Sequence, residues 1–340
     1  MGNRNISKIL CFHALILCLL STACYEPVAN RSADFENKRE TVSFEPENKN
    51  IANKEEVANV SNANVDPISN KSDEMSKPIE EKVNKAAGFR GNLTQNLSRS
   101  GLTISSVVDE SSPVEKRVFE EYGAVFLTKA TPPDRAMFTS ESEVSTFQSK
   151  AGAKRANIGG INVELQSAAA AALESASNDA KRQGLSITPR HPEDSARRSY
   201  AHTLKLWTGR VNDACRHWKS KGKLSGEQIS RLKSLPIKQQ VAEVLELEKK
   251  GIFFSTYFNK SILYSVAAPG TSQHISMLAF DAKEFGNKKV RAIMAKHGWF
   301  RTVQSDEPHF TYLGYREDEL PGLGLKKVST GKGEFWIPNI

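Results

Sequence analysis

Apolar residues recur at helical spacing along most of the chain beyond residue 113. Positions three and four apart share one face of a helix, so this spacing indicates amphipathic helices that each bury one side. Gly184 and Gly222 follow two of these segments, and Pro236 separates two others, as expected at helix ends. The predicted helices cover residues 114–122, 140–150, 163–182, 195–221, 227–235, 237–249 and 288–297.

Short apolar or alternating runs between these segments predict strands. Residues 124–127 form a continuous apolar run that suits a buried strand, and residues 185–188 alternate. The other predicted strands follow the long helices, at residues 252–257, 262–266, 277–280, 310–313 and 334–336. Helices first and strands later indicate an α+β domain.

The first hundred residues differ in composition from the rest of the chain. All four tryptophans lie in the last 140 residues, whereas Asn, Glu, Lys, Ser and Val dominate residues 25–100. Such a segment has too little apolar surface to offset the chain entropy lost on folding. We therefore expect a disordered tether over residues 25–111 and a folded domain over residues 112–340.

Residues 1–24 have the outline of a secretory signal peptide. Basic residues precede an apolar stretch over residues 9–20, which is too short to cross about 30 Å of hydrocarbon, and small residues then lead to Cys24. Cys24 resembles the cysteine of the bacterial lipobox, which is lipidated at the start of the mature chain, although Ser21 stands where leucine is usual. The alternative is cleavage near Ala23 that releases an unanchored chain. We expect an exported protein, lipid-anchored to the periplasm-facing membrane of the envelope.

Charge and cysteine content narrow the choice of function. The formal net charge is +8, but basic and acidic residues are interspersed and form no basic run with aromatics between, so a nucleic-acid partner is not expected. A mild attraction to anionic wall polymer or lipid headgroups is equally compatible with this charge. Cys215 stands alone in the folded part, which excludes a disulfide there and favours a buried apolar role over a catalytic thiol.

Two histidines and an aspartate form the candidate site. His274 and Asp281 are seven residues apart, and His309 follows 28 residues later. Two imidazoles and one carboxylate suit a catalytic zinc, because three protein ligands leave a fourth tetrahedral position open. By spacing alone the alternative, structural histidines, is at least as well supported.

The residues around these three carry a specific motif. Ser272, His274, Ala279 and Asp281 fit S-x-H-x-x-G-x-A-x-D, with Met277 at the glycine position, and aromatic strand residues follow His309. This pattern resembles the zinc D-alanyl-D-alanine carboxypeptidase and dipeptidase family, which shares the hedgehog/DD-peptidase fold. The resemblance implies helices packed on a small, mostly antiparallel sheet, with His274, Asp281 and His309 as zinc ligands and Ser272 beside the substrate.

The resemblance also implies an arginine that fixes the substrate and stabilises developing negative charge. Arg198 and Ser199 resemble the R-S of that family motif, while Thr203 stands where glutamine is usual. A guanidinium suits this task because its fork of donors is rigid and always charged. Arg190 and Arg197 are rivals, and any one of the three arginines could instead be a solvated surface residue.

An acidic residue just before His309 is the candidate general base. On a regular strand Glu307 shares a face with His309 and Asp306 points away. The family places its acid three residues before the histidine, and Pro308 makes a regular strand unfavourable. We therefore expect Asp306 to be the base, with Glu307 as the alternative.

The activity implied by the resemblance is hydrolysis of D-Ala-D-Ala, or of a related D-amino-acid bond in peptidoglycan stem peptides, by zinc-activated water. A peptidoglycan endopeptidase with the same ligands is one alternative, and a zinc-retaining binding module without turnover is another. Neither Trp299 nor His297 is expected at the site, since core packing suits the tryptophan and a helix end suits the histidine. The sequence leaves the oligomeric state open.

Overall fold

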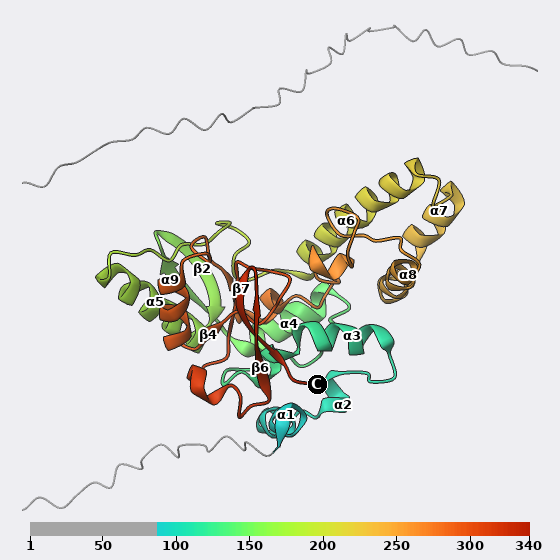
Figure 1. Ribbon diagram of the computed structural model, residues 1–340. Helices are drawn as coiled ribbons and strands as arrows, with labels where there is room; N and C mark the ends of the chain where they lie inside the picture. Colours follow the sequence, from blue (N-terminus) through green and yellow to red (C-terminus); the bar gives the residue numbers. More distant parts are fainter. Residues whose placement is uncertain (1–86) are drawn as a thin grey trace, which may run out of the picture. The chain divides into compact units, whose positions relative to one another are not determined.

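The computed structural model describes residues 87–340, a mixed domain of helices and small antiparallel sheets (Figure 1). The sheets are a β1–β2 hairpin, a three-stranded sheet in the order β3–β5–β4, and a β6–β7 hairpin. Helices on small antiparallel sheets agree with the α+β class expected from the order of elements. Within residues 87–340 no helix combines the length and apolar character needed to cross a bilayer.

The domain begins earlier than its composition indicates. Helices α1 (Gly88–Arg99) and α2 (Ile104–Val107) lie within the expected tether, yet Phe89, Leu93 and Leu97 are buried in the main core. The four-residue spacing of these three side chains puts them on one helix face. The boundary at residue 112 is therefore wrong by at least 24 residues. Residues 1–86, including the expected signal peptide, Cys24 and most of the expected tether, lie outside the described part of the chain.

Serine caps open the next helices where the sequence predicts them. Helix α3 (Pro113–Tyr122) starts after Ser112 and α4 (Glu141–Ala151) after Ser140, and each serine hydroxyl accepts a hydrogen bond from a backbone N–H in the first turn. Between them, residues 124–127 are buried as expected but form the 3-10 helix η1 (Gly123–Leu127) and not a strand. An apolar run predicts burial here without fixing the backbone geometry.

The predicted helix over residues 163–182 is in part a strand. Strands β1 (Ala153–Ile158) and β2 (Ile161–Gln166) form a hairpin, and α5 (Ser167–Arg182) follows directly. Gly159 and Gly160 both have positive φ and make the two-residue turn between the strands. The Gly-Gly pair was a hairpin signal that the helical spacing of the alanine-rich segment obscured.

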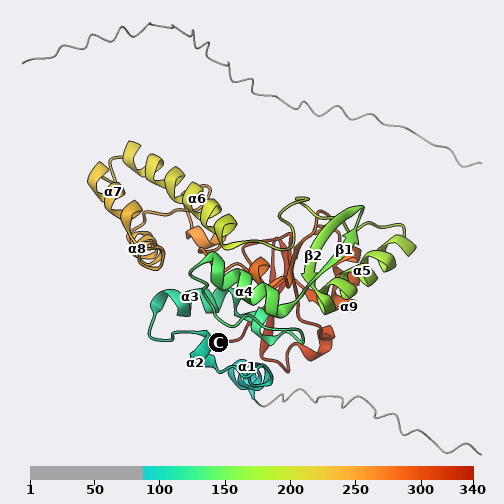
Figure 2. The same cartoon turned by 180° about the vertical axis from the view of Figure 1, so that it is seen from behind.

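Three helices on one side of the small sheets, seen in both Figure 1 and Figure 2, contribute to a second apolar cluster. They are α6 (Tyr200–Ser220), α7 (Gly226–Ser234) and α8 (Ile237–Lys249). Trp207 is fully buried between them, and its indole N–H donates to Gln240. Cys215 is buried in this cluster, and burial raises the pKa of its thiol, in keeping with a packing role.

The chain after α8 is irregular where two strands were predicted. Residues 252–257 form no strand, and residues 262–266 contain only the 3-10 helix η2 (Ile262–Tyr264). Buried Glu248 organises this segment by accepting hydrogen bonds from the backbone N–H groups of Phe254 and Ile262, at 3.2 and 2.6 Å. A side chain has replaced the strand partner that these N–H groups would otherwise need.

The three-stranded sheet carries the candidate site. It contains β3 (Ala279–Asp281), β4 (Trp299–Phe300) and the central β5 (His309–Tyr312). Helix α9 (Lys288–Lys296) matches the predicted helix between the strands expected at residues 277–280 and 310–313, whereas β4 was not expected. The expected strand at residues 185–188 is absent, and only an isolated bridge joins Pro189 to Ala282 beside β3.

The C-terminal residues close the domain. After the 3-10 helix η4 (Glu317–Glu319), β6 (Leu325–Thr330) and β7 (Gly333–Pro338) form the last hairpin. The predicted strand at residues 334–336 is part of β7, whereas β6 was not expected. Trp299 and Phe300 are buried in the main core, as predicted.

Candidate metal centre

Three separate elements bring the predicted metal ligands together. His274 lies on the 3-10 helix η3 (Gln273–Ser276), Asp281 ends β3 and His309 begins β5. Asp281 and His309 are direct partners in the antiparallel pair, so their side chains share one face of the sheet. All three side chains are buried, and they form a group that could hold a metal ion.

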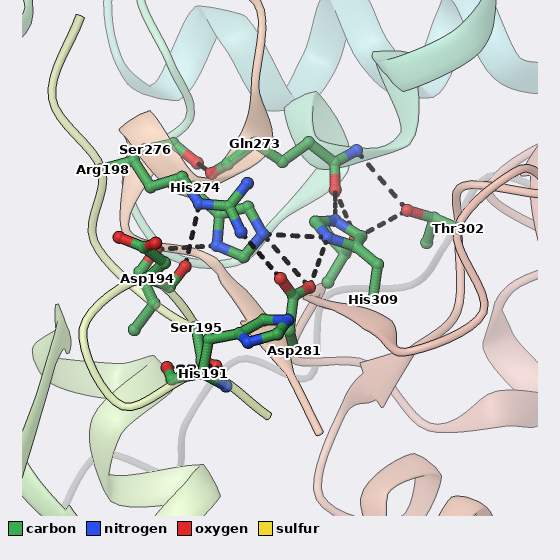
Figure 3. Close-up of polar contacts among 12 residues, drawn as sticks. His191, Asp194, Ser195, Arg198, Gln273, His274, Ser276, Asp281, Thr302 and His309 are labelled. Atoms are coloured by element: carbon green, nitrogen blue, oxygen red, sulfur yellow. Dashed lines mark hydrogen bonds and ion pairs between the residues drawn. The ribbon is translucent and has the colours of Figure 1, made fainter. Parts of the chain in front are cut away.

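One ligand atom from each residue faces a common point (Figure 3). His309 Nδ1 lies 3.1 Å from His274 Nε2 and 3.2 Å from Asp281 Oδ1, and the His274 Nε2 to Asp281 Oδ1 distance is 3.2 Å. Ligands bonded at 2.0–2.1 Å to a tetrahedral zinc are about 3.3 Å apart. The separations therefore fit a small tetrahedral cation.

Hydrogen bonds on the far side of each ring set the tautomers. His274 Nδ1 lies 2.7 Å from the carbonyl oxygen of Ala196, and His309 Nε2 lies 2.8 Å from Gln273 Oε1. Both partners are acceptors, so these nitrogens must carry the protons. The nitrogens that face each other and Asp281 then present lone pairs, which is the arrangement a metal requires.

Gln273 orients His309 and was not singled out by the sequence. Its Nε2 donates to the backbone oxygen of Tyr122 at 2.9 Å, which turns its Oε1 toward His309. The Thr311 hydroxyl donates to the same oxygen, and the hydroxyls of Thr302 and Thr311 are in contact. Gln273 directly precedes the predicted ligand His274, but nothing else in the sequence indicates that it contacts His309.

Arg198 holds the ligand carboxylate. Its Nη2 donates to Asp281 Oδ2 at 2.8 Å, leaving Oδ1 for the metal position, and its Nε donates to the backbone oxygen of Asp194 at 2.8 Å (Figure 3). Its side chain is 16% exposed and also lines the cavity beside the ligands. The structure therefore adds a ligand-positioning contact to the substrate contact expected of this arginine.

Electrostatics keep His274 and Asp281 unprotonated at neutral pH. Burial, reinforced by the positive charge of Arg198, lowers the pKa of His274 to about 4. Burial alone would raise the pKa of Asp281, but charge and hydrogen bonding from His274 and His309 outweigh it and hold that pKa well below its usual range. At neutral pH the site therefore offers a neutral imidazole at His274 and a carboxylate at Asp281, which need lose no proton to bind a cation.

A cavity of about 180 Å³ opens beside the two histidines. Its polar lining includes Ser272, Arg198 and Asp306, and its apolar wall comes from Leu206 and the segment around Tyr264. Leu206 and Tyr264 are 42% and 46% exposed, so the apolar wall of the cavity is accessible from solvent.

The structure separates the two candidate bases. Asp306 lines the cavity, whereas Glu307 Oε1 lies 3.1 Å from Lys332 Nζ and is not among the lining residues. The Asp306 side chain is exposed to solvent, although many protein atoms lie around its carboxyl group. Burial among these atoms, together with the negative charge of Asp281, raises the pKa of Asp306 against the opposing effects of His309 and Arg198. A carboxyl whose pKa is raised is better suited to accept a proton.

The other polar candidates have different places. Ser199 caps α6 by accepting a hydrogen bond from the backbone N–H of His202, and it does not line the cavity beside the two histidines. Arg197 pairs with Glu164 at 2.7 Å, and the Arg190 guanidinium lies over the ring of Phe285. Of the three rival arginines, Arg198 alone is both at the ligands and on the cavity wall.

Met277 adopts a left-handed backbone conformation at the glycine position of the motif. Its φ is 57° and its ψ 30°, and its side chain is fully buried. This conformation costs an ordinary residue about 1–2 kcal/mol and costs glycine nothing. The glycine position of the motif therefore requires positive φ, which methionine meets at an energetic cost.

Comparison of the chain with protein-family models, with curated proteins and with solved structures returned no match.

Proposed function

We propose that this protein is a zinc metallopeptidase that hydrolyses D-Ala-D-Ala or a related D-amino-acid bond in peptidoglycan stem peptides. The observation that carries the proposal is the convergence of His274 Nε2, His309 Nδ1 and Asp281 Oδ1 on one point at the edge of a cavity. Two imidazoles and one carboxylate are a donor set that suits zinc. The substrate class comes from the motif around His274, Asp281 and His309.

Two polar residues of the cavity have different roles in the proposed hydrolysis. A bound zinc supplies Lewis acidity, which lowers the pKa of a coordinated water to about 7 and polarises a carbonyl. Asp306 lines the same cavity and accepts the proton that the attacking water loses. Arg198 presents a fixed positive charge to the cavity, suited to a substrate carboxylate or to the oxyanion that develops on the carbonyl.

Defined muropeptides test this proposal. The purified protein should release D-Ala, or cut another D-amino-acid bond, in a reaction that a chelator abolishes and zinc restores, and mass spectrometry of the products identifies the bond. His274→Ala should be inactive, while His191→Ala, which removes an exposed imidazole, should retain activity. A protein that binds stoichiometric zinc and leaves every muropeptide intact would instead be a binding module, and a cut within a cross-link would make it an endopeptidase.

Export and anchoring form a separate part of the proposal. Cys24 follows a signal-peptide-like segment, and we propose that it carries the lipid that tethers the domain to the envelope. Cys24→Ser should shift the protein from the membrane fraction to the soluble fraction and change its mobility. A variant that fractionates and migrates as the parent does would refute the anchor without affecting the proposed activity.

A further inference from the structure

A second cavity lies between α9, β4 and the β6–β7 hairpin, and it shares no lining residue with the cavity beside the metal ligands. Its volume is about 410 Å³. Figure 1 shows these elements close together, on the side of the domain away from α6, α7 and α8. The charged side chains that line it are Lys288, Arg291, Arg301, Glu317, Lys327 and Glu334.

Arg301 is the buried charge in this cavity. Only 4% of the residue is exposed, and its guanidinium lies 3.9 Å from the ring centre of Phe335. Its Nη2 donates to the backbone oxygen of Lys332, but Nε and Nη1 are buried without any hydrogen-bond partner. Such unpaired donors on a buried charge are costly, which indicates that a group outside the chain satisfies them.

Arg291 brings a second positive charge to the same place. Both guanidinium groups lie close to the Cα of Gly333. A methyl group added there would lie 3.0 Å from Arg301 Nη1 and 3.7 Å from Arg291 Nη2. Arg291 Nη1 donates to the backbone oxygen of Phe285, and in the described part of the chain neither arginine forms an ion pair with a carboxylate. Two adjacent guanidinium groups repel each other, and an anion bound between them would offset this repulsion.

The acids of the cavity do not supply that anion. Lys327 Nζ lies 3.1 Å from Glu317 and 3.0 Å from Glu334, so the two carboxylates share this cation, and neither forms an ion pair with Arg291 or Arg301. Trp299, which lines the same cavity and is fully buried, adds an indole N–H that has no acceptor. Unpaired donors and two neighbouring guanidinium charges therefore coincide in one cavity.

We propose that this cavity binds an oxyanion, with Arg301 and Arg291 as its charged donors and Trp299 as a neutral one. Water could accept the free hydrogen bonds but would leave two neighbouring guanidinium charges unbalanced, whereas an oxyanion meets both needs. Lys288, exposed at the first turn of α9, extends the positive surface toward solvent. The ligand group is a phosphate, sulfate or carboxylate.

Titration of the full-length protein in chelator tests this site without reference to the metal centre. Calorimetry with sulfate and, separately, with acetate probes tetrahedral and carboxylate oxyanions, with chloride at equal ionic strength as the reference. We expect saturable binding of at least one oxyanion, weakened roughly tenfold in Arg291→Gln because one charge-assisted contact is lost. Arg291 is half-buried, so this variant is a milder test than replacement of Arg301.

Lys289→Gln is the matched control, because Lys289 is exposed on the same helix and does not line the cavity. It should bind the oxyanion as the parent does. Binding of sulfate identifies phosphate-like ligands and binding of acetate alone identifies carboxylates. Absence of saturable binding to either, or equal affinity in Arg291→Gln and the parent, would overturn the proposal, and neither result bears on muropeptide hydrolysis.

Discussion

At the scale of single residues, Asp306 and Glu307 are neighbours in sequence with opposite surroundings. Asp306 faces the cavity that contains the candidate ligands, whereas Glu307 pairs with Lys332. Asp306→Ala should keep zinc but lose about a hundredfold to ten-thousandfold in kcat/KM, the usual effect of removing a general base. Glu307→Ala should retain most activity. Kinetics on a defined muropeptide, with zinc measured by elemental analysis, check both, and the reverse ranking would transfer the role to Glu307.

Met277 allows the cost of a left-handed residue to be measured. Both Met277→Ala and Met277→Gly remove a buried side chain, which costs about 2–5 kcal/mol in such cores. Only glycine relieves the positive φ, so the glycine variant should be more stable than the alanine variant by about 1 kcal/mol. Urea unfolding monitored by circular dichroism gives this difference. An alanine variant as stable as the glycine variant would show that the conformation carries no penalty.

The residues of the site were predictable to different degrees. His274, Asp281 and His309 came from a motif, and the structure brings their ligand atoms together. Arg198 was expected to face substrate, but its contact with Asp281 depends on how residues 194–198 pass beside β3, which no local pattern encodes. Gln273 was missed because a side-chain amide acquires its role only when the strand with His309 pairs beside it.

At the scale of elements, helices with caps and stops were predicted well and short apolar runs were not. Helices α3, α4, α7, α8 and α9 match their predicted spans within a residue or two. A strand is defined by a partner that local sequence does not contain, and residues 124–127, 252–257 and 262–266 found none. Glu248 shows the reason in one case, because its carboxylate takes the backbone N–H groups of Phe254 and Ile262.

Glu248 should make the domain less stable as pH rises. Burial raises the pKa of its carboxyl above the ordinary value of 4.5, so the folded state keeps this proton to higher pH than the unfolded state does. Its contribution is therefore fully present below pH 4.5 and declines as pH rises through the folded-state pKa. Glu248→Gln should remove this decline from the free energy of unfolding.

Urea unfolding at a series of pH values between 4 and 7 measures the effect as the difference between parent and variant. Glu246→Gln is the control, because Glu246 lies on the same helix and is exposed. A pH dependence that is the same in all three proteins would show that Glu248 does not titrate between the two states.

At the scale of the whole molecule, the candidate metal centre joins parts of the chain that are distant in sequence, so cation binding should stabilise the entire domain. A ligand that binds only the folded state at a thousand times its Kd contributes about 4 kcal/mol, or on the order of 10 °C in Tm for a domain of this size. Differential scanning calorimetry with zinc and with chelator measures this shift. The apoprotein should still unfold cooperatively, because two large apolar clusters do not depend on the site.

The stabilisation by zinc should fade in acid. Protons compete for His274 as pH falls toward its pKa of about 4, so the difference between the zinc and chelator scans should shrink there. His274→Ala should show little difference at any pH. A shift of equal size in this variant would place the bound zinc elsewhere.

The sequence contains one sign that the folded domain begins before residue 112. Phe89, Leu93 and Leu97 recur every four residues within a segment otherwise polar enough to resemble the tether. What the sequence could not show is their partner surface, since α1 packs against η1 and against the chain near Gly324. A polar helix with one narrow apolar stripe becomes stable only when the distant surface is already formed.

The pairing of Asp281 with His309 across β3 and β5 would make metal binding at this site depend on correct strand alignment. A slip of one residue between these strands would turn His309 to the opposite face of the sheet and separate it from both other ligands. Misaligned chains would therefore lose tight metal binding even when their apolar surface is buried. A cation that bound these three ligands would then select the native strand alignment from its near neighbours.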